Sequence, residues 1–392
     1  MEKALLLCSS HNDLGLVRAL RKLGYYIIVT GNRPNLPGQR WCDEFIEADY
    51  SDKELILAIA KEKKIDNIVQ CCNDFGVYTA SYVAEQLGLP GYDSYENTLI
   101  LHNKDKFKEF TKMHNIISPI SERFSDKDAA KEFAYRTQYP IIIKPTDCSA
   151  GNGITKVEDA VHANEAIDNA FKASRAGCIV IEPYIHGSQH GFCTYLINQK
   201  VVAVCSNNEY SFLNPYRVEI DTYPADNYDQ VKEILINEIE KIASILKLKD
   251  GIFHLQYIYD GKKPQIIEVM RRILGNMYHV PGNLLTGIDW EYWETRAKCG
   301  LSLEGFPKGV NQEGFYAYKS ILANKNGIVD RIEIPTLYNK YLTDSYIIHQ
   351  SGHQIDRFGS DPMGFLFFMF PTYEEMKKIL IEDYRNNLVI LK

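Results

Sequence analysis

The first part of the chain alternates short apolar runs with segments whose apolar residues recur at helical spacing. Residues 53–64 are one of these predicted helices. The apolar runs are residues 3–8, 25–31, 45–50 and 65–72. Strands that alternate with helices in this way form parallel sheets in α/β proteins. We therefore predict a doubly wound parallel sheet over residues 1–92.

The rest of the chain mixes helical patterns with hairpins. Residues 191–207 predict a hairpin that turns at Asn198 and Gln199, and residues 251–272 predict two antiparallel strands joined at DGKK. Four further segments have helical spacing: residues 103–115, 129–138, 158–174 and 228–249. Towards the C-terminus we expect short strands, including a buried strand at 363–370, and a final helix at 374–384.

Composition narrows the class of protein without indicating a function. The 392 residues are 45% hydrophobic and 24% charged, which is ordinary for a soluble globular protein of two or three domains. The net charge of −7 argues against nucleic acid as a partner, because proteins that wrap nucleic acid usually carry basic patches. We expect no signal peptide and no membrane span. Nine scattered cysteines without a C-x-x-C pair fit free thiols and a cytoplasmic location.

The stretch IIIKPTDCSAGNG, residues 141–153, carries the first chemical signal. Lys144 ends an apolar strand, where a charge is costly to bury unless it meets an anion. The small residues at 149–153 offer backbone N–H groups with little steric bulk, which suits phosphate binding. Neither a P-loop nor a Rossmann fingerprint is present. The alternative interpretation is a lysine that reaches solvent beside a mobile turn.

The order of several segments carries more information than any one of them. Lys104 lies in NKDKFK, EPYIHGSQ occupies residues 182–189, HLQY occupies 254–257 and IIEVMRR occupies 266–272. This order resembles the ATP-grasp superfamily of carboxylate–amine ligases. The N-terminal part, with RALRKLGY, DYSD and GLPG, resembles the preATP-grasp domain of carbamoyl phosphate synthetase, biotin carboxylase and carboxyaminoimidazole ribonucleotide synthetase. The resemblance covers roughly residues 3–300.

The resemblance implies an α/β architecture in three parts. A preATP-grasp domain with the doubly wound parallel sheet spans residues 1–92, and an ATP-grasp domain spans residues 93–304. A mobile lid, about residues 117–186, would close over the nucleotide. A small C-terminal β-rich domain, residues 305–392, would pack alongside.

The same resemblance assigns the residues that would bind ATP. Lys104 and Lys144 would hold the α- and β-phosphates, as point charges suited to that role. Glu182 would accept a hydrogen bond from the adenine amino group, and the alternative is a plain strand-end carboxylate. Gln189 stands where the family usually has a glutamate facing the ribose, and an amide can also bond hydroxyls. The phosphate loop and the adenine edge add Ser149, Gly151, Gly153, Tyr184 and Ile185.

The implied magnesium site departs from the family pattern. The family has an acidic residue on one strand and a Glu and an Asn on the next, whereas this sequence has Gln256, Glu268 and Met270. Glu268 is a hard ligand and Gln256 can offer a carbonyl oxygen, but Met270 is a poor partner for Mg²⁺. One carboxylate together with nucleotide phosphates can suffice for Mg²⁺, so the number of metal ions stays open.

Arg272 aligns with the family's arginine, which would stabilise the transferred phosphoryl group or grip a carboxylate as a catalytic and substrate-binding residue. Arg271 should point to the opposite side, as a surface or salt-bridge residue. His279 lies in the loop 274–283, either as a substrate contact or in a structural hydrogen bond. Asp74 either touches substrate or caps the next helix.

These assignments predict an ATP-dependent ligase that activates a carboxylate as an acyl phosphate for attack by an amine, giving an amide, ADP and phosphate. ATP and Mg²⁺ are the implied cofactors, and a small-molecule carboxylate and amine are the implied substrates. Two alternatives stay open: a carboxylase that uses bicarbonate, and a non-catalytic ATP-binding regulator. The sequence does not identify the substrates, the pathway or the oligomeric state, for which a homodimer is an expectation from the resemblance alone.

Overall fold

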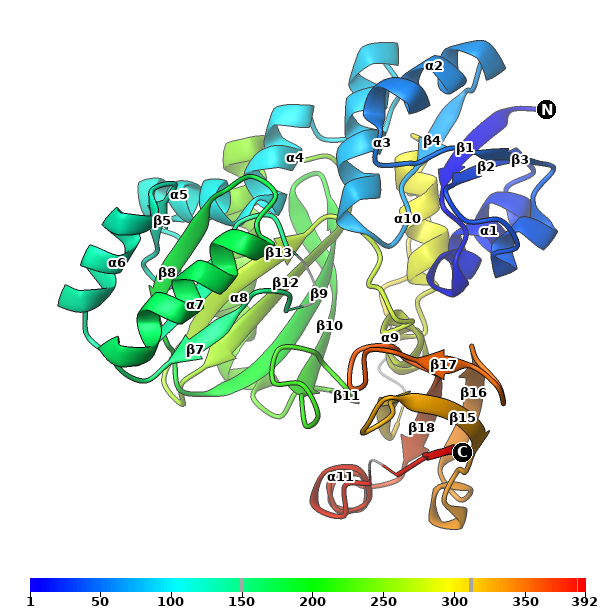
Figure 1. Ribbon diagram of the computed structural model, residues 1–392. Coiled ribbons are helices and arrows are strands. Elements are labelled where there is room, and N and C mark those ends of the chain that lie inside the picture. The colour runs from blue at the N-terminus through cyan, green and yellow to red at the C-terminus, as the bar shows by residue number, and fades with distance from the viewer. Residues whose placement is uncertain (149–150, 310–312, 386) are drawn as a thin grey trace.

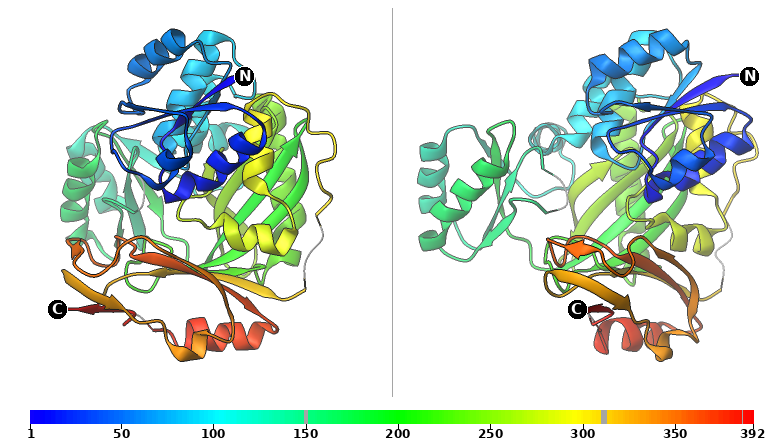
Figure 2. Two further views of the ribbon diagram at one scale, coloured as in Figure 1. Left: turned by 90° about the vertical axis from the view of Figure 1, so that its right-hand side faces the viewer. Right: turned by 45° about the vertical axis from the view of Figure 1, so that its right-hand side comes forward.

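The structure is a computed structural model that describes residues 1–148, 151–309, 313–385 and 387–392. In Figure 1 the N-terminal sheet is blue, a lid formed by four short strands and two helices projects at the left, and a large sheet occupies the centre. The two views in Figure 2 show the same arrangement, with the C-terminal segment at the opposite end from the N-terminal sheet.

The N-terminal sheet is parallel, with strand order β3-β2-β1-β4. Its strands are β1 (Lys3–Leu7), β2 (Tyr26–Gly31), β3 (Glu44–Glu47) and β4 (Asn67–Val69). Its helices are α1 (Leu14–Lys22), α2 (Lys53–Lys63) and α3 (Asp74–Leu87), with 3₁₀ turns η1 (His11–Asp13) and η2 (Pro37–Trp41). Helices cover both faces of the sheet, so β1 and β2 are continuous apolar runs. The predicted parallel α/β architecture is confirmed.

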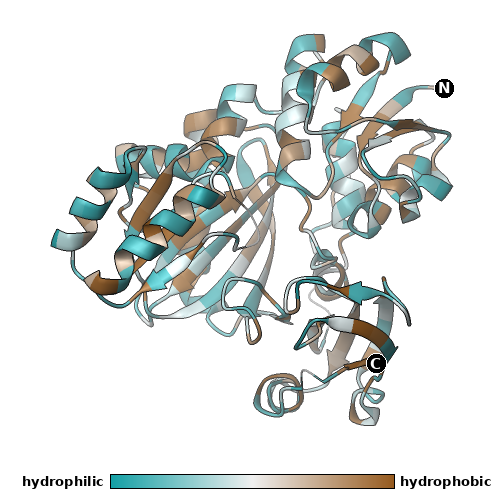
Figure 3. Ribbon diagram, in the orientation of Figure 1, coloured by the Kyte–Doolittle hydropathy of each residue, from teal (hydrophilic) through white to brown (hydrophobic). Residues whose placement is uncertain are grey.

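The lid is an antiparallel sheet with strand order β5-β8-β6-β7. Its strands are β5 (Glu122–Phe124), β6 (Ile141–Pro145), β7 (Thr155–Val157) and β8 (Ile179–Pro183). Helices α6 (Lys127–Arg136) and α7 (Ala160–Ala173) pack against it around Ile143 and Ile167. Figure 3 shows teal and brown residues in alternation along both helices, which is the pattern of helices that are half-exposed. Helices α4 (Tyr95–His102) and α5 (Lys104–His114) connect the N-terminal sheet to the lid.

The large sheet has the strand order β13-β12-β9-β10-β11-β14-β18-β16. The strands of its first half are β9 (Ser188–Ile197), β10 (Lys200–Tyr210), β11 (Ile220–Tyr223), β12 (Gly251–Tyr259) and β13 (Pro264–Met270). Both predicted hairpins are confirmed, because β9 pairs with β10 and β12 pairs with β13. Helix α8 (Tyr228–Leu246) packs on one face through Leu235 and Ile239, together with α4 and α5. The opposite face is polar at one end, around Glu209 and Gln256, and apolar at the other, where Tyr195 and Ile252 belong to a core cluster.

The C-terminal segment is rich in strands, as expected, and three of its strands continue the large sheet. Strand β14 (Phe315–Ile321) pairs with β11, and β18 (Gly364–Phe370) and β16 (Leu342–Ile347) follow. An open edge at β11 would leave unpaired backbone groups, and β14 covers that edge. The predicted buried strand at 363–370 is β18, and the final helix is α11 (Tyr373–Lys377) followed by the π-helical turn η4 (Lys378–Glu382).

A second, small sheet completes the C-terminal segment. Its strands β15 (Gly327–Ile332), β17 (Gln354–Ile355) and β19 (Val389–Leu391) are joined in the order β17-β15-β19, and η3 (Thr336–Tyr338) lies between β15 and β16. A satellite core of aromatic and aliphatic side chains fills the space between the two sheets. In the described part of the chain, no helix combines the length and apolar character that a bilayer crossing needs. All nine cysteines are described, and all are free thiols.

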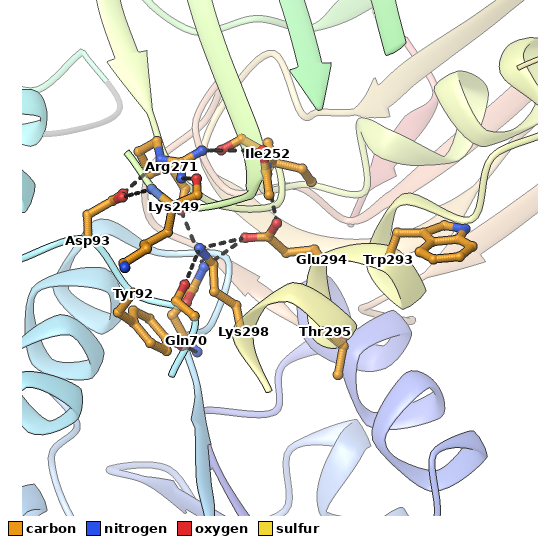
Figure 4. Close-up of polar contacts among 12 residues, drawn as sticks. Gln70, Tyr92, Asp93, Lys249, Ile252, Arg271, Trp293, Glu294, Thr295 and Lys298 are labelled. Atoms are coloured by element: carbon orange, nitrogen blue, oxygen red, sulfur yellow. Dashed lines mark hydrogen bonds and ion pairs between the residues drawn. The ribbon is translucent and has the colours of Figure 1, made fainter. Parts of the chain in front are cut away.

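Two helices join the N-terminal sheet to the large sheet: α9 (His279–Thr286) and α10 (Trp290–Lys298). Helix α10 packs directly against α1, and a Cβ at Gly15 would lie 2.2 Å from Glu291 Oε1, so only glycine allows this approach. Figure 4 shows the polar network at this junction, which contains Arg271, Asp93 and Glu294. The Arg271 side chain is buried, and its Nε donates to Asp93 Oδ2 at 2.9 Å. The junction is therefore held by buried ion pairs as well as by apolar packing.

Candidate active site

A cavity of about 490 Å³ lies between the lid and the polar face of the large sheet. Most of the residues predicted for the site line it. They are Asp74, Lys104, Lys144, Gly151, Glu182, Tyr184, Ile185, Gln189, Gln256, Glu268 and Arg272. Gly153 and His279 do not line it, and Ser149 lies outside the described residues. Segments that are far apart in the sequence thus converge on one space.

Lys144 points into the molecule and does not reach solvent. Strands β6 and β8 are antiparallel neighbours, which brings Lys144 close to Glu182. The Lys144 Nζ donates to Glu182 Oε2 at 2.8 Å, and both residues are buried. The interpretation as a solvent-exposed strand end is therefore wrong for Lys144, and the anion that it meets in this structure is Glu182.

Lys108 is a third member of this cluster, which the sequence analysis missed. It lies one helical turn after Lys104 on α5, and its Nζ is 3.3 Å from Glu182 Oε1. Burial lowers the pKa of Lys108 to about 8, although Glu182 opposes the shift. Burial alone would raise the pKa of Glu182, but Lys108 and Lys144 outweigh burial and hold the pKa at about 2. The spacing of lysines along α5 was the signal available in the sequence.

Lys104 and Glu268 form the next ion pair along the cavity wall. Lys104 begins α5, and its Nζ donates to Glu268 Oε1 at 3.0 Å and to the Cys148 carbonyl at 3.0 Å. Burial would lower the pKa of Lys104, but the charge of Glu268 raises it. Lys104 is therefore held as a cation beside the end of the lid strand that carries Lys144.

Arg272 lies between Asp74 and the cavity. Its Nε donates to Asp74 Oδ1 at 2.7 Å, and its charge holds the pKa of Asp74 well below the usual range although burial opposes this. Asp74 does not cap α3, because the neighbouring Asn73 Oδ1 accepts from the Phe75 N–H at 2.9 Å. Asp74 instead orients Arg272. Arg271 is a salt-bridge residue as predicted, but it is buried in the junction of Figure 4 and not at the surface.

The cavity is also lined by two carboxylates that the sequence analysis missed. Glu209 on β10 and Asp221 on β11 are cross-strand partners, and both line the cavity. The Gln256 Nε2 donates to Glu209 Oε2 at 2.8 Å, and the Gln189 Nε2 donates to the same oxygen at 2.6 Å. The polar run at residues 206–209 on β10 was the available signal, but a strand that faces solvent on one side also carries polar residues.

The predicted metal ligands fit Mg²⁺ only in part. Glu268 and Gln256 are opposite each other on β13 and β12, and they offer a carboxylate and an amide oxygen. Met270 faces His254 in the same ladder and adds no hard ligand. In the residues that the structure describes, no group of three His, Cys, Asp or Glu side chains is arranged to hold a metal ion. The chemistry of the pair suits an ion whose remaining ligands are phosphate oxygens and water.

Of the two alternatives for His279, the structure shows the structural hydrogen bond. It begins α9, and its Nε2 lies 2.8 Å from Glu291 Oε1 on α10, so it supports the junction instead of the cavity wall. Burial would lower the pKa of His279, but Glu291 raises it. Gly153 is also structural: its φ is +72°, and a Cβ there would lie 2.7 Å from Ala173. The loop sequence did not reveal that His279 has a buried acidic partner on the next helix.

Comparison with known proteins agrees with this geometry. Residues 102–214, which include the lid and both cavity lysines, match the family described as phosphoribosylglycinamide synthetase, ATP-grasp (A) domain. This part of the chain is therefore similar to an ATP-grasp domain. The match begins just before Lys104 and ends just after Glu209, so it covers the lid and the first two strands of the large sheet.

The similar proteins extend this likeness over the whole chain. The carbamoyl phosphate synthase large chain of Clostridium acetobutylicum is 26% identical over 266 residues, which are 65% of this chain and 24% of that protein. The chain thus spans about a quarter of the length of this relative. The L-amino acid ligase from Bacillus licheniformis has a TM-score of 0.84 at 18% identity, with 100% of this chain and 99% of that chain covered. Phosphoribosylglycinamide synthetase from Anaerococcus prevotii has a TM-score of 0.78 at 20% identity, with both chains fully covered.

Proposed function

We propose that this protein is an ATP-dependent ligase that activates a carboxylate as an acyl phosphate and transfers the acyl group to an amine. The observation that carries this proposal is the convergence of Lys104, Lys144 and Arg272 on a single cavity, which the segment similar to an ATP-grasp domain helps to form. Phosphoryl transfer needs little covalent help from a protein, and it depends on positioning and on neutralising the charge of the phosphates.

The lid side of the cavity suits the nucleotide. Lys104 and Lys144 supply fixed positive charge for the phosphates, and each now holds a carboxylate that a phosphate oxygen can replace as the partner. Gly151 allows its loop to pack closely against Tyr216, since its φ is +75° and a Cβ there would lie 2.5 Å from the Tyr216 Cβ. Glu182, Tyr184 and Ile185 lie at the end of β8, where the proposal places the adenine ring.

Arg272 is the residue that we assign to the transferred group. Asp74 fixes its Nε, which leaves the rest of the guanidinium beside the cavity. A preorganised arginine stabilises negative charge as it develops on the phosphoryl group and on the acyl carbon oxygen, and it can bind a carboxylate through two hydrogen bonds. Glu268 and Gln256 would hold Mg²⁺, which would supply positive charge against the phosphates when bound.

Closure of the lid would protect the acyl phosphate. The lid contributes Lys144, Gly151 and Glu182 to the cavity wall, so ATP bound to these residues would draw the lid towards the large sheet. Exclusion of water would favour attack by the amine over hydrolysis. The products are then an amide, ADP and phosphate.

The test is phosphate release from ATP and Mg²⁺ with a panel of carboxylates, each combined with ammonium or with an amino acid. We expect release that needs both a carboxylate and an amine, and that is lost in Lys144→Ala and Glu268→Ala. Lys127→Ala is the matched control, because Lys127 pairs with Asp168 on the outer surface of the lid. ATP binding without turnover on any combination would favour the non-catalytic regulator instead.

A further inference from the structure

Four lysine and arginine side chains line the cavity: those of Lys104, Lys144, Arg217 and Arg272. Three of them hold a carboxylate, at 3.0 Å for Lys104, 2.8 Å for Lys144 and 2.7 Å for Arg272. Arg217 differs from them, because its guanidinium forms no ion pair and no hydrogen bond with any residue that the structure describes. Within the described part of the chain, Arg217 is therefore the cavity-lining cation whose charge no carboxylate offsets.

The charge of Arg217 stays unpaired although two further carboxylates line the same cavity. Glu209 accepts a hydrogen bond from the Gln256 amide at 2.8 Å, and Asp221 accepts one from the Asn207 amide at 3.0 Å. Neither of the two carboxylates forms an ion pair with Arg217 among the described residues. Arg217 is half-buried, so it has lost part of its hydration without gaining an anion in return. Its charge is thus available to an anion that enters from outside the protein.

The backbone that carries Arg217 is held from two sides. Arg217 lies in the loop between β10 and β11, next to Tyr216. The Tyr216 hydroxyl accepts a hydrogen bond from the Lys156 N–H on lid strand β7 at 2.7 Å. Nearer β10, the ring of Phe212 stacks on Tyr384, with the ring centroids 4.0 Å apart. A guanidinium on an anchored loop loses less conformational freedom when it binds a ligand, which favours affinity.

Tyr278 connects Arg217 to the part of the cavity that contains Arg272. The Tyr278 hydroxyl donates to the carbonyl of Val218, the residue after Arg217, at 3.0 Å. Burial and the charge of Asp221 raise the pKa of Tyr278, and the charge of Arg217 opposes this rise. Tyr278 lies on the segment that directly follows Arg272, and both residues line the cavity. The segment that begins with the arginine assigned to the reacting group therefore also contacts the loop of Arg217.

The chemistry of the Arg217 side chain favours a carboxylate as its ligand. A planar guanidinium donates two parallel hydrogen bonds to a carboxylate, and it stays charged in proteins. One arginine matches the single charge of a carboxylate, whereas a phosphate monoester carries up to about two charges and three acceptor oxygens. The proposed function already assigns Lys104 and Lys144 to the nucleotide phosphates and Arg272 to the reacting group. The anion at Arg217 is therefore an additional group.

We propose that Arg217 binds a second carboxylate of a substrate, which is not the carboxylate that ATP activates. This group belongs either to the amine, as the carboxylate of an amino acid, or to the acyl donor, as the far carboxylate of a dicarboxylic acid. Its contact with Arg217 fixes one end of the substrate while the reacting end lies at Arg272. The inference rests on the proposed function and names its substrate class, and it adds no step to the reaction.

The experiment compares substrates that differ only in this carboxylate. Each amino acid of the panel is compared with its amide, such as L-alanine with L-alaninamide. Each dicarboxylic acid is compared with its monoamide, such as succinate with succinamate. Phosphate release from ATP gives kcat and KM for the wild type, Arg217→Gln, Arg217→Lys and the control Arg136→Gln. Arg136 is an exposed arginine that pairs with Glu132 on lid helix α6.

The inference predicts that Arg217→Gln raises KM about 10–100-fold for the substrates that carry the second carboxylate, the effect of losing a hydrogen-bonded charge. KM for the amide counterparts and for ATP should stay within about twofold of the wild type. The value of kcat should change little, because the contact is equal in the ground state and the transition state. Arg217→Lys keeps the charge and should recover part of the loss.

The pairs of substrates also identify the source of the carboxylate. A difference confined to the amino acids places the group on the amine, and one confined to the dicarboxylic acids places it on the acyl donor. Equal losses with both members of every pair would overturn the inference and would indicate that Arg217 pairs with Glu209 or Asp221 when the cavity closes. Unchanged kinetics in Arg217→Gln would also overturn it.

A binding measurement separates this inference from the proposed function. Thermal unfolding is followed with Mg²⁺ and a non-hydrolysable ATP analogue, with L-alanine, L-alaninamide, succinate or succinamate added. We expect the acid of one pair to stabilise the wild type and Arg136→Gln more than its amide does, and this difference to disappear in Arg217→Gln. The same difference in Arg217→Gln would overturn the inference. A wild type that shows the difference but no turnover would overturn the proposed function alone, and one that shows neither would overturn both.

Discussion

Arg271 and Arg272 are adjacent in sequence, and their environments differ completely. Arg271 points into the junction of Figure 4, where it bonds to Asp93 and to the backbone carbonyls of Gly251, Ile252 and Lys249. Arg272 bonds to Asp74 and to the Ile273 carbonyl, and it also lines the cavity. The junction network is closed on itself, whereas the cavity network has polar groups that face open space. The comparison distinguishes a buried charge that stabilises the fold, that of Arg271, from a buried charge that is available to a ligand, that of Arg272.

The largest effect that tests this comparison is on stability. Arg271→Met leaves Asp93 as a buried carboxylate without its cation, so we expect the free energy of unfolding to fall by about 3–5 kcal/mol. Urea denaturation followed by circular dichroism measures the loss. Arg331→Met is the control, since Arg331 pairs with Asp330 and Glu333 at the surface and its loss should leave the midpoint almost unchanged. If Arg271→Met left the free energy of unfolding unchanged, the junction would not be a structural network.

The second prediction concerns Arg272. Arg272→Lys keeps a charge beside Asp74 but removes the planar set of donors, so we expect kcat for ATP-driven ligation to fall by about 10²–10³-fold. The denaturation midpoint should change much less than in Arg271→Met. If the two variants lost stability equally and Arg272→Lys kept full turnover, the two arginines would have the same structural role.

A pH dependence tests the junction again, through His279 and Glu291. Glu291 raises the pKa of His279, and His279 lowers the pKa of Glu291 to about 2, in both cases against the effect of burial. A raised histidine pKa stabilises the fold below the ordinary value of 6.5, and this stabilisation is lost as pH rises through the folded pKa. A lowered glutamate pKa stabilises above the ordinary value of 4.5, and this stabilisation is lost as pH falls towards about 2.

The pair should therefore contribute most between pH 4.5 and 6.5. We expect His279→Gln to cost about 2 kcal/mol in this window and less at alkaline pH. Denaturation of both proteins across the pH range measures the difference. A difference that grows steadily with pH would show that His279 is neutral in the fold.

The smallest effect on stability is expected from Asp221 and Glu209. Their ionisation should lower the free energy of unfolding, whereas the charges of His279 and Glu291 should raise it. Burial raises the pKa values of Asp221 and Glu209, so their ionisation destabilises the fold as pH rises above the ordinary values of 3.8 and 4.5. Asp221→Asn should therefore match the wild type at acidic pH and become more stable by about 1 kcal/mol towards neutral pH. Thermal unfolding at several pH values tests this. A variant that is less stable than the wild type at neutral pH would contradict an uncompensated carboxylate.

The local sequence pattern predicted most of the fold, because the spacing of apolar residues distinguishes strands from helices. The parallel N-terminal sheet, the two hairpins and the strand β18 all follow from short stretches of sequence. The continuation of the large sheet through β14 could not be predicted in this way, since the pairing of β11 with β14 joins segments about a hundred residues apart. Pairing between distant strands leaves no periodic signal in either strand.

Residues at the cavity could be predicted where the order of the motifs assigns them a place. They could not be predicted where a residue's partner lies far away in the sequence. Lys104, Lys144 and Arg272 line the cavity, and each was predicted from its place in the order of segments. Glu209 and Asp221 were missed because they face each other across two strands whose polar positions have no motif. The sequence left the role of His279 undecided, because its partner Glu291 is on another helix. Charge pairing across elements is decided by packing, which a single sequence does not display.

The measurement that tests the central claim most directly follows oxygen from the carboxylate. The carboxylate that best drives phosphate release is labelled with ¹⁸O in its carboxyl group, and the released phosphate is analysed by mass spectrometry after one round of ligation. An acyl phosphate transfers one carboxylate oxygen to phosphate, so the account predicts one ¹⁸O atom in each phosphate. Unlabelled phosphate formed together with product would contradict activation of a carboxylate in this cavity.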